Sequence, residues 1–206
     1  DGSAVACAVA DPDSPDGVME VRFRPFAEAG HDGAEYRTWL NAKTDGDPVS
    51  LFRGGVESCS GTNPLPGSAV DGDPDTAIHS FGPGGLGENV LDWVAVELPE
   101  PVEFRRVVLG AGIDATTGGW FDTVSVMPEL QIREHPAGPW ITIAVVENYP
   151  STTTLDDGGI RPGQRFEIRL AEPVTACGLR VRGVGSWGHV HFARRITVSE
   201  LAAFAS

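Results

Sequence analysis

The chain has little positive charge and no long apolar run. Its 206 residues include 15 Lys and Arg against 29 Asp and Glu, a formal net charge of -14. Proteins draw most of their affinity for phosphate groups from Lys and Arg, so this balance argues against nucleic acid or an anionic membrane as a partner. No segment approaches the ~20 apolar residues that a membrane-spanning helix needs. The acidic balance instead favours solubility and the binding of cations.

Cysteine is also scarce. Cys7, Cys59 and Cys177 match no Cys-x-x-Cys spacing, and no histidine lies at a matching interval, so zinc is not expected. Either one disulfide forms and leaves one thiol over, or all three are small buried side chains. A bond between Cys59 and Cys177 would close a loop of roughly 118 residues and contribute about 4 to 5 kcal/mol in the chain-entropy description.

No catalytic set is recognisable in the sequence. Gly-x-Ser-x-Gly is absent, as is any evident pair of opposed carboxylates or nucleophile beside a base. The glycine-rich residues 82–87 lack the Lys-Ser/Thr that follows in a phosphate-binding loop. We therefore interpret them as a loop at one end of a β fold, where binding surfaces usually lie.

Short strands and turns dominate the chain after residue 50. Apolar or alternating segments occur at residues 94–98, 104–109, 130–133, 140–146, 166–170, 179–182 and 196–204, separated by Gly, Pro, Asp and Ser. No stretch of residues 50–206 has the sustained three-to-four period of a substantial helix. The spacing predicts an all-β sandwich or barrel.

The first 50 residues differ from the rest. Residues 1–17 suggest a turn-rich linker, residues 18–24 and 36–40 predict two strands, and residues 45–48 form a plausible boundary. We therefore expect an N-terminal linker with strands at 1–50 and a main domain at 51–206. Because residue 1 is Asp, we expect a processed or excised fragment, so the absence of a signal peptide does not argue against secretion.

An acidic turn precedes the first strong strand. Between Ser68 and Ser80, Asp71, Asp73, Asp75 and the Thr76 hydroxyl supply the hard oxygen atoms that calcium prefers. An ordinary solvated acidic turn is the alternative, since Asp-Gly pairs are frequent in loops. The residues alone leave both interpretations open.

Two later loops combine aromatic and polar side chains. One contains Asp114 and Trp120, and the other contains Trp187, His189 and Arg194. Sugars stack on aromatic rings while Asp, His or Arg satisfy their hydroxyls, so these residues are candidates for carbohydrate binding. Trp120 is equally suited to cap the core, and residues 187–192 to form an ordinary strand with one buried face. His189 and His191 would lie on the same face of a strand, but the sequence offers no evident third ligand, so a metal site there is not expected.

Three segments resemble one family in their order. The acidic turn at residues 69–76, the Asp-Trp-Val strand at 92–98 and the closing strand at 196–201 are similar to the discoidin domain, or coagulation factor V/VIII C-type domain. Family 32 carbohydrate-binding modules belong to the same galactose-binding-like superfamily. The resemblance implies an eight-stranded antiparallel jelly-roll β-sandwich. It also implies a calcium ion held by Asp71, Thr76 and Glu200, with main-chain oxygens near Ala69, Asp73, Thr76 and Ser199.

The resemblance extends to modules appended to bacterial glycoside hydrolases, through residues 118–121, 128–133 and 138–140. It implies a non-catalytic, calcium-stabilised carbohydrate-binding module of a secreted bacterial enzyme, with the catalytic domain of the same polypeptide and a glycan or polysaccharide as partners. Residues 24–39 resemble the end of the β-sandwich that follows the catalytic barrel in some bacterial glycosidases, so residues 1–50 are either the tail of a preceding domain or two amphipathic strands that lead into the main domain. The alternative is a structural or protein-binding discoidin-like domain without a sugar site.

Overall fold

The structure is a computed structural model that describes residues 49–61, 67–73, 75–81, 91–112, 118–124, 126–188 and 194–205. These residues belong to one compact unit, Val49–Ser206. The strands expected at 18–24 and 36–40 lie outside the described residues, and the domain boundary at residue 50 stays a prediction. Within the described residues, no helix is long and apolar enough to cross a membrane.

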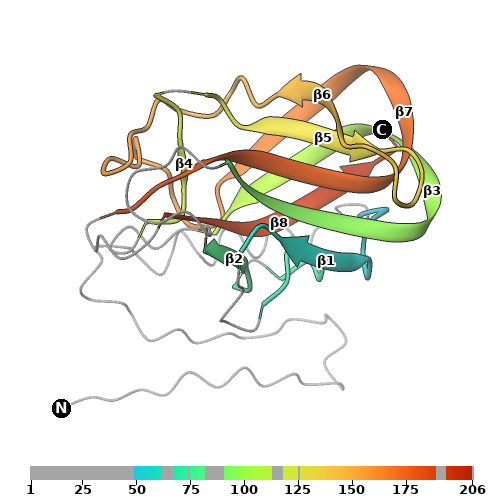
Figure 1. The fold of residues 1–206 in the computed structure, drawn as a ribbon, viewed down its shortest axis with the longest axis horizontal. Coiled ribbons are helices and arrows are strands. Elements are labelled where there is room, and N and C mark those ends of the chain that lie inside the picture. Colours follow the sequence, from blue (N-terminus) through green and yellow to red (C-terminus); the bar gives the residue numbers. More distant parts are fainter. Residues whose placement is uncertain are drawn as a thin grey trace, which may run out of the picture. The chain divides into compact units, whose positions relative to one another are not determined.

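The unit is all-β, as predicted (Figure 1). Its strands are β1 (Val56–Cys59), β2 (Ile78–Phe81), β3 (Leu91–Ala111), β4 (Phe121–Asp122), β5 (Glu129–Arg133), β6 (Ile141–Val145), β7 (Arg165–Gly185) and β8 (Arg195–Phe204). They form one antiparallel sheet in the order β2-β8-β3-β7-β5-β6, with β1 added to β3 and β4 added to β7. The jelly-roll expectation is confirmed.

Two long strands connect the two halves of this sheet. The first part of β3 pairs with β1 and with the last part of β7, whereas its second part pairs with β8 and with the first part of β7. The register shifts between Glu97 and Val102, where Pro99 and Pro101 interrupt the ladder because proline has no N–H to donate. The sheet therefore changes direction there, and its two halves share one core.

The apolar segments seen in the sequence form the core. Val94 and Val96 on β3 are 0% and 1% exposed, and all ten residues of β8 are buried. Phe52 packs edge-on against Phe104 with ring centroids 5.7 Å apart, which closes the core beside β1. Strands buried on both faces need apolar or paired side chains throughout, and β8 meets this with Arg195 and Glu200 as its only charged residues.

The two described cysteines are both free. The Cys59 thiol donates to the Gly61 main-chain oxygen at 3.4 Å, and the Cys177 thiol donates to that of Arg133 at 3.4 Å. A Cys59–Cys177 disulfide is therefore wrong, and the alternative of small partly or fully buried thiols holds for these two. Burial also raises the pKa of the Cys177 thiol, which keeps it in the unreactive protonated form. Cys7 lies outside the described residues.

Candidate functional site

The acidic turn lies between β1 and β2 and contacts β8. The Ala69 main-chain oxygen accepts a hydrogen bond from the Leu201 N–H at 2.7 Å. The Ala69 N–H in turn donates to a carboxylate oxygen of Glu57 on β1. Because Ile78 pairs with Val198, the end of the turn lies next to residues 199–201. The turn and the closing strand are therefore neighbours, although they are far apart in the sequence.

Four oxygen atoms gather inside this turn. Thr76 Oγ1 lies 2.8 Å from Asp71 Oδ2, 3.0 Å from the Ser68 main-chain oxygen and 3.1 Å from that of Asp73. The Thr76 hydroxyl has one hydrogen, so it donates to only one of these three oxygens at a time. The other oxygens keep lone pairs directed at the same region, and atoms of this kind are the ligands that calcium prefers. The chemistry of the turn fits a hard cation.

Local hydrogen bonds fix the shape of the turn. Asp71 Oδ1 accepts from the Asp73 N–H at 2.8 Å, and Asp73 Oδ1 accepts from the Asp75 N–H at 2.9 Å. Such bonds from Asp side chains to the main chain two residues on are typical of tight turns. The Asp73 carboxylate is thus engaged in the turn, while its main-chain oxygen faces Thr76. Among the described residues, no three His, Cys, Asp or Glu side chains group as metal ligands, so a cation here would depend on main-chain and hydroxyl oxygens together with the Asp71 carboxylate.

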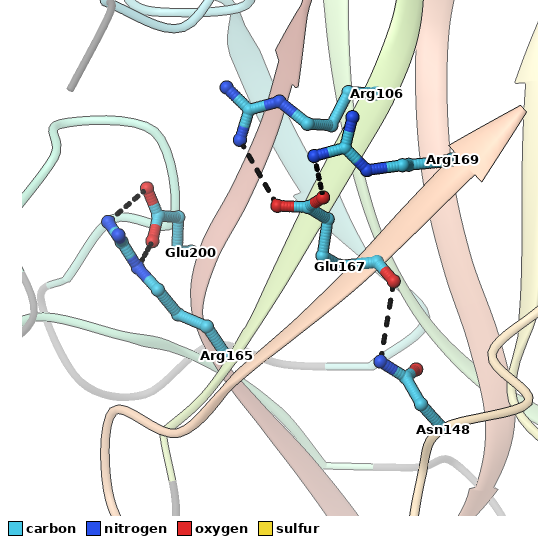
Figure 2. A network of polar contacts seen from close by, with 6 residues as sticks. All are labelled: Arg106, Asn148, Arg165, Glu167, Arg169 and Glu200. Carbon is cyan, nitrogen blue, oxygen red and sulfur yellow. Dashed lines mark hydrogen bonds and ion pairs between the residues drawn. The ribbon is translucent and has the colours of Figure 1, made fainter.

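Glu200, which the resemblance implies as a calcium ligand, lies in an ion pair. Arg165 on β7 holds both of its carboxylate oxygens, with Nε 2.7 Å from Oε2 and Nη2 3.1 Å from Oε1 (Figure 2). The Glu200 side chain is only 10% exposed, so this is a partly buried, bidentate ion pair. Ser199, beside it, donates from its hydroxyl to the Ala111 main-chain oxygen at 3.2 Å. The turn thus gathers four oxygen atoms, and the Glu200 carboxylate is engaged by Arg165.

A second region of interest is one end of the sandwich, here called the loop end. The final residues of β2 and β7 and the first residues of β3 and β8 meet there: Phe81 pairs with Arg195, and Leu91 with Val184. The acidic turn adjoins the other end of β2, three residues away, which is roughly 10 Å along a strand. The acidic turn and the loop end are therefore separate regions of the sandwich.

Two of the predicted ligand-binding residues lie together at the loop end. The Arg194 guanidinium is 5.5 Å from the centroid of the half-buried Trp187 ring, and the Trp187 main-chain N–H donates to the Thr154 main-chain oxygen. Gly118 lies against this segment, since a Cβ on Gly118 would come within 2.8 Å of the Trp187 carbonyl carbon. The two loops predicted from sequence therefore do meet. Asp114 and His189 lie outside the described residues.

Trp120 occupies the core beneath this surface. It is 1% exposed, and its indole N–H donates to the Thr153 main-chain oxygen at 2.7 Å. Its main-chain N–H donates to the hydroxyl of Ser186, which is itself fully buried. A ring this buried presents no face to a sugar. Trp120 is therefore a core residue, as the alternative interpretation of the sequence expected. We call Asp92, Trp120 and Ser186 the floor of the loop end, and Trp187 and Arg194 its rim.

Asp92 is a floor residue that the sequence interpretation missed. It is 1% exposed and accepts a hydrogen bond from the Ser60 hydroxyl, which also shares one with the Ser80 hydroxyl. Burial raises the pKa of Asp92 to about 6, although the Ser60 and Gly185 hydrogen bonds and the charge of Arg194 favour its ionised form. The one available signal was a lone carboxylate at the start of an otherwise apolar strand.

Comparison with known proteins gives a match in fold. No protein-family model and no curated protein sequence matches the chain. Among solved structures, the lectin domain of lectinolysin, complexed with Lewis B antigen, matches with a TM-score of 0.51 over 78% of this chain and 99% of that domain, at 15% identity. The chain has a discoidin-like fold.

Other similar structures are carbohydrate-binding modules. Chitosan-binding module 1 of a chitosanase/glucanase from Paenibacillus sp. IK-5 matches with a TM-score of 0.49 at 19% identity, over 75% of this chain and 98% of that one. The family 32 module of C. perfringens NanJ, in complex with galactose, matches with a TM-score of 0.46 at 13% identity, over 71% and 92%. At such identities the likeness concerns the fold.

Proposed function

We propose that residues 51–206 form a non-catalytic carbohydrate-binding module, attached to the catalytic domain of a secreted bacterial glycoside hydrolase. Support comes from the fold, which is also that of a lectin domain solved with a glycan antigen. Support for a site comes from the rim, where an indole ring and a guanidinium lie together beside the Gly118 loop. Fold alone does not define a ligand, so the rim is the observation on which the proposal depends.

The chemistry of the rim suits a sugar. An indole ring offers an apolar face for the C–H side of a pyranose, and Arg194 offers N–H donors for hydroxyl groups. One stacked ring with a few partly solvated hydrogen bonds corresponds to a dissociation constant on the order of 0.1 to 1 mM. Weak, rapidly reversed binding suits a module that raises the local concentration of a tethered enzyme at its polysaccharide.

We also propose that a calcium ion binds at the acidic turn. Asp71 Oδ2, Thr76 Oγ1 and the main-chain oxygens of Ser68 and Asp73 are the atoms that would hold it. Its contribution would be structural: a divalent charge would neutralise the carboxylate and draw the turn together beside β8. Four protein oxygens are fewer than the six to eight ligands that calcium takes, so water would complete the shell. We expect a dissociation constant of about 10⁻⁴ M or weaker, as in extracellular modules.

The glycan proposal is tested by Trp187→Ala with Trp140→Ala as a matched control. Trp140 packs against Gly178 on β7, seven residues before the strand ends at Gly185, which is roughly 20 Å from the loop end. Affinity electrophoresis and calorimetry against a broad panel of polysaccharides would measure binding. We expect at least a tenfold loss for Trp187→Ala and unchanged affinity for Trp140→Ala. Wild-type protein that binds no glycan in the panel, or equal binding by both variants, would favour the structural or protein-binding alternative.

A further inference from the structure

The ion pair between Arg165 and Glu200 depends on a glycine between them. Gly110 on β3 pairs with Arg165 on one side and with Glu200 on the other, so the two charged residues lie on strands separated by β3. Strands two apart in a sheet are roughly 9 to 10 Å from each other, a distance that a long arginine side chain spans only over a small residue. A Cβ on Gly110 would lie 2.8 Å from Glu200 Cβ, so Gly110 leaves this path open.

The same face carries a second, more exposed ion pair for comparison. Glu167 accepts from Arg106 at 3.4 Å and from Arg169 at 2.6 Å (Figure 2). Arg169 is 74% exposed and Glu167 39%, against 28% and 10% for Arg165 and Glu200. The pair at Glu200 is thus the more buried of the two, and only there does a bidentate arginine reach across an intervening strand.

We infer that in this chain Arg165, and not a cation, is the partner of the Glu200 carboxylate, so that β8 is joined to β7 by an ion pair that does not depend on metal. This inference rests on the proposed cation site and departs from the ligand set that the family resemblance implies. Glu200 has two carboxylate oxygens, and Arg165 holds both in fork-to-fork geometry. Calcium at the turn is then bound only by residues 68–76.

The pair is tested by a double-mutant cycle on thermal unfolding, run in chelator and in excess calcium. Arg165→Met leaves the largely buried Glu200 carboxylate unpaired, so we expect the melting temperature to fall by about 4–10 °C in both conditions. Adding Glu200→Leu removes the unpaired charge and should restore most of this loss. Arg169→Met, the matched control on the same strand, should shift the melting temperature by less than about 2 °C because its pair is exposed.

Calcium titration by calorimetry separates this inference from the cation proposal. Asp71→Asn should lower calcium affinity at least tenfold, whereas Glu200→Gln should leave it within about threefold of wild type. The inference is overturned if Glu200→Gln loses calcium affinity as Asp71→Asn does, or if the Arg165→Met penalty disappears in calcium. If wild-type protein binds no calcium, the cation proposal fails, and rescue by the double variant still decides whether the ion pair joins the strands.

Discussion

The floor and the rim of the loop end contain similar residues in opposite environments. Trp120 on the floor is 1% exposed, with its indole N–H bonded to the Thr153 main-chain oxygen, whereas Trp187 on the rim is half-buried beside Arg194. Trp120 follows Gly119 and Trp187 follows Ser186, so both tryptophans come directly after a small residue and their sequence contexts are alike. The environment of the ring, and not its neighbours in sequence, therefore separates a core side chain from a candidate ligand platform.

The largest effect expected is on stability at the floor. Trp120→Ala removes a fully buried ring and should cost about 3–5 kcal/mol in the free energy of unfolding. Trp187→Ala removes a partly solvated ring and should cost less than about 1 kcal/mol. Urea denaturation of both variants measures the difference directly. Equal losses for the two variants would remove the distinction between floor and rim.

The second prediction concerns the buried carboxylate of the floor. Burial raises the pKa of Asp92 from 3.8 to about 6, so the folded protein keeps this proton at pH values where the unfolded chain has lost it. The associated stability is full below about pH 4 and is lost as pH rises through about 6, a change of about 3 kcal/mol. Asp92→Asn should therefore unfold with a flatter dependence on pH between 4 and 6.

The control for this prediction is Glu172→Gln, which removes one carboxylate at an exposed position of β7. This variant removes the same charge as Asp92→Asn without touching the floor, so it measures the effect of one lost carboxylate alone. An Asp92→Asn profile parallel to wild type between pH 4 and 6 would mean that the ionised Asp92 is well accommodated by Ser60, Gly185 and Arg194.

The strands themselves were largely predictable from the sequence. Short apolar or alternating segments bounded by turn residues identified β5, β6 and β8 within one or two residues. Residues 94–98 and 104–109 were interpreted as two strands, yet they are parts of β3, as 166–170 and 179–182 are parts of β7. Pro99 and Pro101 suggested a strand end, but they mark a change of pairing partner within one long strand.

The contacts between distant residues were not predictable in the same way. That Arg165 faces Glu200 follows from the register of β7, β3 and β8 and from the missing side chain at Gly110, and one sequence does not define the register of three strands. The hydrogen-bond partners of Thr76 could be anticipated from the sequence, because they lie within eight residues of Thr76. Local turns were therefore predicted better than charge pairing across the sheet.

The smallest effect expected is at Gly118, which lies against the main chain of the rim residue Trp187. Gly118 has a φ of +86°, and a Cβ there would lie 2.8 Å from the Trp187 carbonyl carbon and 2.9 Å from Gly188 N. Main-chain atoms cannot rotate away as a side chain does, so Gly118→Ala should displace the rim. We expect a loss of about 1–3 kcal/mol in stability and weaker glycan binding.

Gly159→Ala is the matched control, since Gly159 has a φ of +78° and no atom lies within 4 Å of the position its Cβ would occupy. It carries the backbone cost of placing alanine in the left-handed region, about 1–2 kcal/mol, without the contact. The difference between the two variants therefore measures how tightly the Gly118 loop constrains Trp187, and calorimetry with the best glycan reports the effect on binding. If Gly118→Ala costs no more than Gly159→Ala and binds glycan as wild type does, the rim adapts to the added methyl group, and the position of Trp187 is set by residues other than this glycine.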